Sequence, residues 1–320
     1  MTVELRPAGR ADAPAIHELV RSIETGDREP QVTTLEEIEE WFDEPYFEPL
    51  TMTRLAVIPD RLVGYGRLWH RPSGERLERV YLPGGVDPGH RGKGIGHAIL
   101  EWQCEAGAAL VQNYEHDLPR FLFLNSWDWL ESDHAFYRRH GFEPMRYFAE
   151  MLRPLDDLPA VAVLDGISLE DWSDRHAEGT RLLFNAAFAD HWGSTPVPAD
   201  AWPHRLSRSG VRLDLSVLAT AEGRVVGAAI NGVYPSDFAS SGRRDGWIET
   251  LGVDAGFRRR GIAAALIAAS LARFAADGLT HAMIGVDSDN PTGAYGLYER
   301  MGFRPLHRHT TFGREVAVSH

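Results

Sequence analysis

Two short stretches in opposite halves of the chain carry most of its information: VDPGHRGKGIG, residues Val86 to Gly96, and VDAGFRRRGIA, residues Val253 to Ala263. In each half a predicted strand leads into the stretch. Each is followed by apolar residues at three- and four-residue spacings, which is typical of an amphipathic helix. The sequence therefore repeats a strand, a glycine-rich turn and a helix once in each half.

The similarity between the halves extends beyond these turns. A hairpin-like stretch precedes each one, RLVGYGRLW from Arg61 and RVVGAAINGV from Arg224. Farther along, each half contains Tyr-x-x-x-Gly-Phe, beginning at Tyr137 and at Tyr298. The order of elements is the same twice, and it predicts an α/β fold in each half.

The length of the chain also favours two domains. A single domain commonly holds about 100 to 200 residues, and this chain has 320. The segment MLRPLDDLPAV, residues 151–161, contains two prolines and no clear periodicity. We therefore predict domains 1–157 and 158–320. In the second, the spacing predicts a helix from about Arg259 to Ala276 and a strand over His281–Asp287.

Composition argues against several classes of function. Hydrophobic residues make up 43% of the chain, yet no run approaches the roughly 18 apolar residues of a membrane span. A formal net charge of −13 disfavours nucleic acids and anionic membranes as partners. Cys104 is the only cysteine, which excludes an intrachain disulfide and a cysteine-based zinc site. The N-terminus lacks the apolar core of a secretory signal. We expect a cytoplasmic protein without a metal site.

The glycine-rich turns have the composition of an anion-binding site. Backbone N–H groups in the first turn of a helix lack intrahelical acceptors, and the helix dipole is positive there. Glycines let the backbone approach a phosphate closely. Arg91 and Lys93 in the first copy, and Arg258 to Arg260 in the second, add positive charge. A single copy of these residues could equally be an ordinary solvent-exposed basic turn. Two copies in matching contexts favour phosphate binding.

Two better-known phosphate motifs fit less well. A Walker A loop requires Ser or Thr after its Gly-Lys, whereas Gly94 follows Gly92 and Lys93. A dinucleotide-binding G-x-G-x-x-G that starts at Gly92 would require glycine at His97. Neither motif therefore accounts for the turn.

The residues resemble the GNAT superfamily of acyl-CoA N-acyltransferases. The family pattern R-x-x-G-x-G/A occurs in both halves, as Arg91, Gly94 and Gly96 and as Arg258, Gly261 and Ala263. A second pattern, N-x-x-x-A-x-x-x-Y-x-x-x-G-F, is complete only in the second half, as Asn290, Ala294, Tyr298, Gly302 and Phe303. In the first half Trp129 and Asp133 replace the Asn and the Ala, while Tyr137 remains.

The resemblance implies two tandem GNAT folds, each a mixed, splayed β-sheet flanked by helices, and acetyl-CoA as the cofactor. Pantetheine would pair with the end of the fourth strand, at Leu251 to Val253 in the second lobe and at Leu82 to Val86 in the first. Asn290 would lie beside the pantetheine arm. The pyrophosphate would rest on two sets of backbone amides, those of Arg259, Arg260, Gly261, Ile262 and Ala263 and those of Gly92, Lys93, Gly94, Ile95 and Gly96.

The implied reaction is direct attack of an amine on the thioester. A carboxylate would take the amine proton, and Glu249, four residues before Val253, is expected on the same strand face. The resemblance gives Tyr298 the role of protonating the departing thiolate, and the amide of Val253 would stabilise the oxyanion. The alternatives are a solvent-exposed sheet carboxylate at position 249 and a packed aromatic at position 298.

The first lobe departs from this pattern. Leu82 holds the place that corresponds to Glu249, and Pro83, Gly84 and Gly85 interrupt the approaching strand. We expect this lobe to hold CoA at most, with catalysis in the second lobe.

The acceptor is expected to be a small-molecule primary amine. His191 and Trp192 are candidates for binding it, although Trp192 and Trp202 would equally suit packing of a loop onto the sheet. The two-lobed chain also resembles the mycothiol synthase family, which acetylates a cysteinyl amine on an aminosugar inositol. Other amines, and a non-catalytic CoA-binding sensor, remain alternatives. Because a tandem chain can satisfy dimer-like pairing internally, we expect a monomer.

Overall fold

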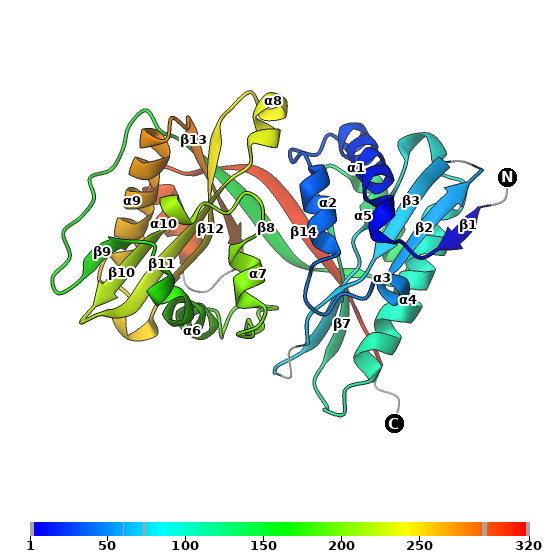
Figure 1. Ribbon diagram of the computed structural model, residues 1–320, viewed down its shortest axis with the longest axis horizontal. Coiled ribbons are helices and arrows are strands. Elements are labelled where there is room, and N and C mark those ends of the chain that lie inside the picture. The colour runs from blue at the N-terminus through cyan, green and yellow to red at the C-terminus, as the bar shows by residue number, and fades with distance from the viewer. Residues whose placement is uncertain (1–2, 60, 73–74, 290–292, 318–320) are drawn as a thin grey trace. The chain divides into compact units, whose positions relative to one another are not determined.

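The computed structural model describes residues 3–59, 61–72, 75–289 and 293–317 (Figure 1). Two compact units form: unit 1 comprises Met1–Arg146 with His309–His320, and unit 2 comprises Tyr147–Arg308. This division differs from the predicted domains 1–157 and 158–320 at both ends of unit 2. Within the described ranges, no helix has both the length and the apolar character that crossing a bilayer requires.

Unit 1 contains two groups of paired strands. Strands β1, β2, β3 and β6 form one sheet, and β5 pairs in parallel with β7. The elements are β1 (Glu4–Arg6), α1 (Ala13–Asp27), α2 (Leu35–Trp41), α3 (Pro49–Met52), β2 (Thr53–Ile58), β3 (Arg61–Arg67), β4 (Trp69–His70), β5 (Glu78–Tyr81), β6 (Gly84–Val86), α4 (Ile95–Gln112), β7 (Arg120–Trp127), α5 (Glu131–Arg139) and the end of β14 (Arg304–Glu315).

Unit 2 is built on a mixed sheet in the order β8, β13, β12, β11, β10, β9. Only β12 and β13 are parallel to each other. The elements are β8 (Glu143–Pro154, from Tyr147 onward), β9 (Ser168–Asp171), α6 (Ala177–Ala187), α7 (Trp202–Leu206), β10 (Val217–Ala221), β11 (Arg224–Val233), α8 (Phe238–Ser241), β12 (Asp245–Val253), α9 (Ile262–Ala276), β13 (His281–Asp287) and α10 (Ala294–Arg300).

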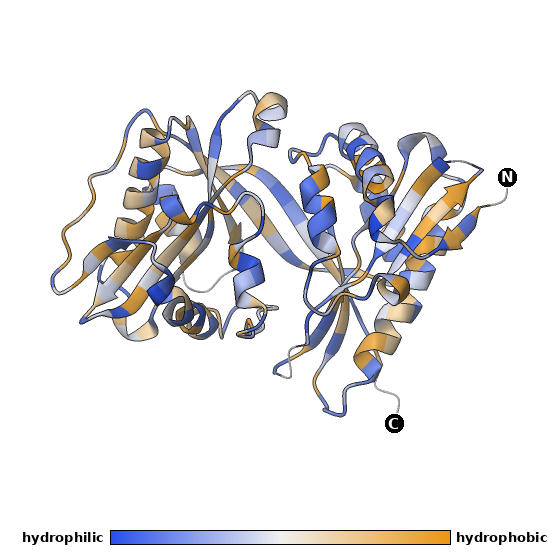
Figure 2. Ribbon diagram, in the orientation of Figure 1, coloured by the Kyte–Doolittle hydropathy of each residue, from blue (hydrophilic) through white to orange (hydrophobic). Residues whose placement is uncertain are grey.

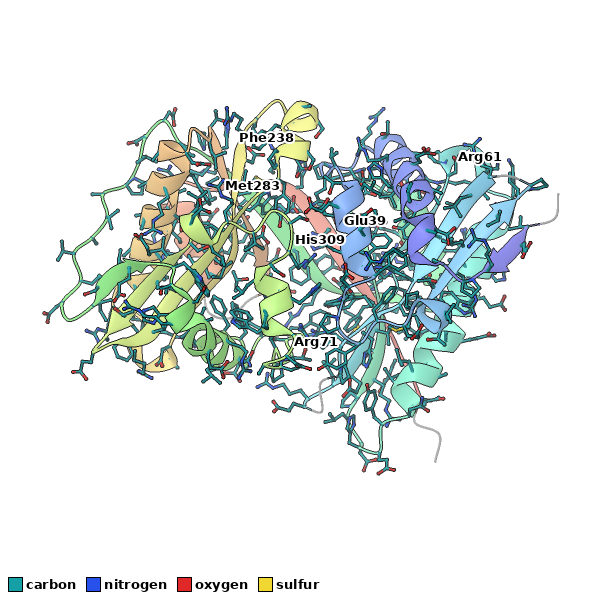
Figure 3. The ribbon with its side chains drawn as sticks, viewed as in Figure 1. Glu39, Arg61, Arg71, Phe238, Met283 and His309 are labelled. Carbon is teal, nitrogen blue, oxygen red and sulfur yellow. The ribbon has the colours of Figure 1, made fainter. Side chains whose placement is uncertain are left out.

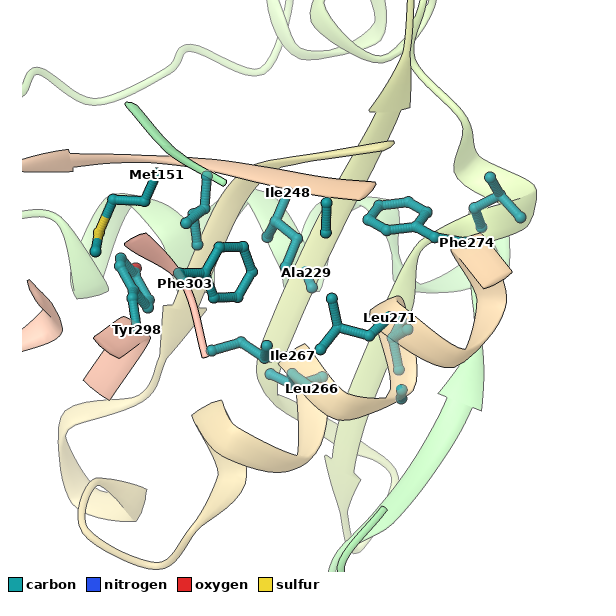
Figure 4. Close-up of a cluster of buried hydrophobic side chains, with 14 of the residues drawn as sticks. Met151, Ala229, Ile248, Leu266, Ile267, Leu271, Phe274, Tyr298 and Phe303 are labelled. Atoms are coloured by element: carbon teal, nitrogen blue, oxygen red, sulfur yellow. The ribbon is translucent and has the colours of Figure 1, made fainter. Parts of the chain in front are cut away.

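Two hydrophobic clusters cover opposite faces of the unit 2 sheet. Ala229 of β11 packs with α9 and α10, whereas its neighbour Ala228 packs with α6 and α7. Successive strand residues point to opposite faces, so the apolar run of β11 supplies both clusters. Apolar residues accordingly recur along the central strands and α9 (Figure 2). The α9 cluster is shown in Figure 4.

Each unit includes a strand from the other half of the sequence. The last strand, β14, pairs with β7 over His309–Glu315, and His309 (Figure 3) meets the edge of the Trp127 ring at 5.5 Å. In exchange, β8 pairs with β13 over Phe148–Pro154 and contributes Met151 to the core of unit 2. The sequence could not reveal this exchange, because a strand's own pattern does not specify which distant strand it joins.

Candidate active site

Strands β12 and β13 pair over only part of their length. Their parallel ladder runs from Asp245 opposite His281 to Ile248 opposite Ile284. Beyond Ile248, β12 stays paired with β11 as far as Val253 but is no longer paired with β13. Backbone N–H and C=O groups on that edge can therefore bind an extended ligand that carries amides.

Glu249 occupies a β-bulge at the point where the strands part. Ile248 pairs with Asn231 and Thr250 pairs with Ile230, so Glu249 is an extra residue on β12. Ile248 packs in the α9 cluster. Glu249 lies on the other face, because its Oε1 would be 3.0 Å from a Cβ built at Gly232, whose neighbour in sequence, Val233, faces α9.

The bulge also reverses the alternation of faces along β12. The Thr250 hydroxyl accepts a hydrogen bond from Arg205 on the α7 side at 2.9 Å, so Glu249 and Thr250 face the same way. Val253 packs against the α9 cluster instead. The prediction that Glu249 and Val253 share a strand face is therefore wrong, because it assumed an unbroken alternation.

The surroundings of Glu249 suit a proton acceptor. The side chain is exposed by its surface area, yet the protein around it is dense enough that desolvation raises the pKa of the carboxyl. A hydrogen bond with Tyr234 and the positive charges of Arg208 and Arg205 act in the opposite direction. A raised pKa brings the carboxyl closer to the neutral range in which a general base works best.

Tyr298 lies on the opposite face of the sheet. Its ring packs in the α9 cluster near Met151 and Phe303 (Figure 4), and the residue is 7% exposed. Burial raises the pKa of its phenol to about 12, so the hydroxyl stays protonated at neutral pH. Among the described residues this hydroxyl has no hydrogen-bond partner, which leaves it available to a ligand. The two candidate groups therefore lie on opposite faces of the sheet.

The two glycine-rich turns have the same backbone conformation. Asp87 and Asp254 each accept a hydrogen bond from the amide two residues later, at 2.8 Å. Gly94 and Gly261 then adopt left-handed φ values of 82° and 81°, and a helix begins at the next residue. Arg259 also adopts a left-handed φ of 62°, which costs a non-glycine residue roughly 1–2 kcal/mol.

The turn of unit 2 keeps its donors and charges available. In the part of the chain that the structure describes, the amides of residues 259–263 donate to no backbone carbonyl. Arg258 donates to the carbonyls of Ala187 and Val253, at 3.1 and 3.4 Å. None of Arg258, Arg259 and Arg260 forms an ion pair with a described carboxylate. Free amides at a helix N-terminus with unneutralised arginines fit a pyrophosphate.

The turn of unit 1 is tied to α1 instead. Both Arg91 terminal nitrogens donate to the Asp27 carboxylate, at 2.6 and 2.7 Å. The Trp129 indole donates to the Asp27 carbonyl at 2.9 Å, and the Trp127 indole donates to Glu29 at 3.3 Å. Arg91 follows β6 and Trp129 follows β7, so Asp27 is hydrogen-bonded to residues that follow two different strands.

Two further features separate unit 1 from unit 2. Leu82, at the position that corresponds to Glu249, is 2% exposed and packs in the core, so no base is present there. Burial, together with the negative charges of Glu24, Asp27 and Asp133, raises the pKa of Glu29 to about 7. The negative charge near this turn opposes the binding of phosphates.

The remaining predicted residues lie in different surroundings, and one of them is outside the described part of the chain. His191 is close enough to Arg258 and Asp287 for their charges to act on it, which places it toward the glycine-rich turn, and desolvation lowers its pKa. Trp192 is half-buried in the same loop. Asn290 lies outside the described residues. Trp202 is buried and donates to the Ala177 carbonyl at 2.9 Å, which confirms its packing role.

Three residues beside Glu249 were missed by the sequence reasoning: Arg205, Arg208 and Tyr234. The basic run HRLSR, residues 204–208, is unusual in so acidic a chain and was the one available signal. Tyr234 follows β11 and carries no motif that marks it.

The chain matches known families in both halves. Residues 178–303 match the Acetyltransferase (GNAT) family, and residues 52–144 match an Acetyltransferase (GNAT) domain. The chain is 30% identical over 249 residues to the mycothiol acetyltransferase of Thermobispora bispora, covering 76% of this chain and 77% of that protein. It is 28% identical over 315 residues to the mycothiol acetyltransferase of Sanguibacter keddieii, covering 94% and 92%.

Solved structures show the same architecture. A GCN5-related N-acetyltransferase from Sphaerobacter thermophilus superposes with a TM-score of 0.75 at 25% identity, over 98% of this chain and 96% of that one. A tandem GNAT protein from the clavulanic acid biosynthesis pathway superposes with a TM-score of 0.70 over 100% of both chains, and at 17% identity it supports the fold alone. The chain therefore belongs to the GNAT acetyltransferases: it is an acyl-CoA N-acyltransferase with two tandem GNAT domains that uses acetyl-CoA.

Proposed function

We propose that unit 2 transfers the acetyl group to a small-molecule primary amine, and that unit 1 does not catalyse. The observation that carries this proposal is the parting of β12 and β13 directly after Ile248, with Glu249 bulged beside it. In unit 1 the paired residues of β5 and β7 end at Tyr81, and the buried Leu82 takes the place of the carboxylate.

Several groups of unit 2 are suited to holding acetyl-CoA. The free amides of Arg259, Arg260, Gly261, Ile262 and Ala263 would bind the pyrophosphate, helped by the three arginine side chains. The unpaired edge of β12 at Leu251 and Val253 would pair with the pantetheine amides.

Acetyl-CoA supplies the acetyl thioester that an amine can attack. Glu249 accepts a proton from the acceptor amine, since a neutral amine is required for attack. The hydroxyl of Tyr298, protonated at neutral pH, donates its proton to the leaving thiolate. The amide of Val253 donates a hydrogen bond to the thioester oxygen as negative charge develops there.

A matched pair of tyrosine variants tests which unit works. In Tyr298→Phe we expect kcat for CoA release with a panel of primary amines to fall about 10²-fold or more, because the proton donor is lost. The affinity for acetyl-CoA should stay nearly unchanged. Tyr137→Phe removes the corresponding hydroxyl of unit 1 and should alter kcat less than about twofold.

The opposite pattern would assign catalysis to unit 1. CoA release with any amine would exclude a purely CoA-sensing role. Tight acetyl-CoA binding without release from a broad amine panel would favour that role and contradict the proposal.

A second candidate acceptor is the cysteinyl aminosugar of mycothiol biosynthesis. Its support is the similarity to proteins named mycothiol acetyltransferase, which in one case extends over 94% of this chain. Including a cysteinyl glucosamine in the amine panel compares this acceptor directly with simpler amines.

A further inference from the structure

Two arginines lie on the same face of β12 as the proposed base. Arg205, on α7, donates to the Thr250 hydroxyl at 2.9 Å and has the Trp202 ring 5.9 Å from its guanidinium carbon. Thr250 follows Glu249 directly, and the bulge turns both side chains toward α7. Arg205 is therefore held in place beside the side chain that would accept the amine proton.

The backbone brings Arg208 to the same place. The amide of Val211 donates to the Arg208 carbonyl at 3.1 Å, and Val211 forms an isolated β-bridge with Gly232. Gly232 lies under Glu249, where a Cβ would be 3.0 Å from the carboxylate Oε1. The turn that carries Arg208 is thus anchored at the residue over which Glu249 lies.

These arginines are not neutralised by the protein. Within the described residues, neither Arg205 nor Arg208 forms an ion pair. The charges that act on Arg205 are those of Arg208, of the same sign, and Glu249, and desolvation lowers the pKa of Arg205. Two positive charges therefore share one negative charge, in a chain whose formal net charge is −13.

Other arginines of unit 2 show that this arrangement is not general. Arg212 pairs with both Asp214 and Asp277, and Arg181 pairs with Glu178. Arg208 is exposed, but Arg205 is partly desolvated, and such a guanidinium without a carboxylate partner is unfavourable unless a ligand supplies an anion.

The anion is not expected to be a phosphate of CoA. Thr250 precedes Val253 by three residues, about 10 Å along the strand, and the phosphate-binding turn begins only after Val253. Arg205 and Arg208 are therefore at the end of the site where the acceptor enters.

We propose that the acceptor carries a carboxylate next to its amine, as an α-amino acid does, and that Arg208 and Arg205 bind this carboxylate while Glu249 faces the amine. Guanidinium groups match a carboxylate in shape and can bind it through two hydrogen bonds. This assignment of acceptor class rests on the proposed function of unit 2. It distinguishes the acceptor from a cysteinyl amide, which has no free carboxylate.

Pairs of amines whose carboxyl group is charged in the acid and neutral in the amide test the proposal. The full-length enzyme is assayed with a series of α-amino acids and their primary amides, and the N-acetyl products are measured. We expect each acid to exceed its amide at least tenfold in kcat/KM. Arg208→Gln should remove this preference, mainly by raising KM for the acids, and should change kcat/KM for the amides far less than for the acids. Arg175→Gln, a control at an exposed arginine paired with Glu170, should leave the preference intact.

A binding measurement separates this proposal from the catalytic one. N-Acetyl-L-methionine and its amide are titrated into the CoA-saturated protein by ligand-observed NMR. Carboxylate-dependent binding that Arg208→Gln abolishes supports the anion site even if no amine is acetylated, an outcome that would contradict only the proposed function. Equal binding or turnover of acid and amide, unaffected by Arg208→Gln, overturns the anion site.

Discussion

The two glycine-rich turns share a backbone and differ in what surrounds it. Gly94 and Gly261 have φ values within one degree of each other, and each precedes a long helix. The arginine at the start of the unit 1 turn is bound by the Asp27 carboxylate, whereas Arg258 in unit 2 donates to carbonyls. The motif therefore specifies a backbone shape, and neighbouring residues determine how much positive charge is left free for the phosphate that we propose binds there.

The strands leading to the turns differ in a similar way. In unit 1 the strand is interrupted at Pro83, and the Gln103 amide donates to the Pro83 and Arg67 carbonyls, at 2.9 Å each. In unit 2 the strand is continuous but bulged, and the bulge presents Glu249 beside the parting. In unit 1 the Gln103 side chain fills the irregularity, whereas in unit 2 the irregularity exposes the Glu249 carboxylate.

The largest effect should come from the base. Replacing Glu249 with Gln keeps the shape and removes the proton acceptor, so kcat/KM should fall about 10²- to 10⁴-fold. Desolvation raises the pKa of Glu249, so the wild-type rate should rise with pH at higher values than an ordinary glutamate would give. The pH profile is measured with an amine that stays uncharged over this range. In the variant the rise of the rate with pH should be absent.

If Glu249→Gln keeps the wild-type rate, the chemistry does not depend on the bulged carboxylate of unit 2, and the contrast drawn between the two units is wrong. Acetyl-CoA binding, measured separately, should be similar in both proteins.

A smaller effect is expected on the stability of unit 1. The pKa of Glu29 is about 7 in the folded protein and 4.5 for an ordinary glutamate. Between these values the unfolded chain releases a proton that the folded chain keeps, so stability should fall as pH rises from about 4.5 to 7. Glu29→Gln should remove this loss and stabilise the protein by about 1–3 kcal/mol above pH 7.

Urea unfolding from pH 4.5 to 8 measures this dependence. Glu39→Gln, at an exposed glutamate on α2 (Figure 3), is the matched control and should leave the slope unchanged. If stability depends on pH in the same way in Glu29→Gln and wild type, the titration of Glu29 does not affect the free energy of unfolding, which contradicts the prediction.

Local patterns were enough to predict much of the fold. The helix expected from about Arg259 to Ala276 spans Ile262–Ala276, and the strand expected over His281–Asp287 has those bounds. Both glycine-rich turns were found because glycines at fixed offsets report a backbone conformation directly. Leu82 was expected at the place that corresponds to Glu249, and that unit 1 lacks a catalytic base stays a prediction.

Features that depend on distant contacts could not be predicted. The exchange of β8 and β14 moved the boundary, because strand partners are chosen by tertiary packing. The bulge at Glu249 is visible only in the register with β11. Arg205 and Arg208 can be recognised as candidate site residues only in the structure, where a turn and a β-bridge bring them beside Glu249. Sequence spacing contains none of these relations.

Isothermal titration of acetyl-CoA tests the central claim, that unit 2 holds the working site, most directly. Two matched double variants are compared with wild type: Gly261→Val with Ala263→Leu, and Gly94→Val with Gly96→Leu. Valine at either left-handed glycine distorts the turn by a similar amount. We expect one binding event in wild type, lost in the unit 2 variant and kept in the unit 1 variant. Binding that survives the first pair of changes and disappears with the second would place the cofactor in unit 1 and contradict the account.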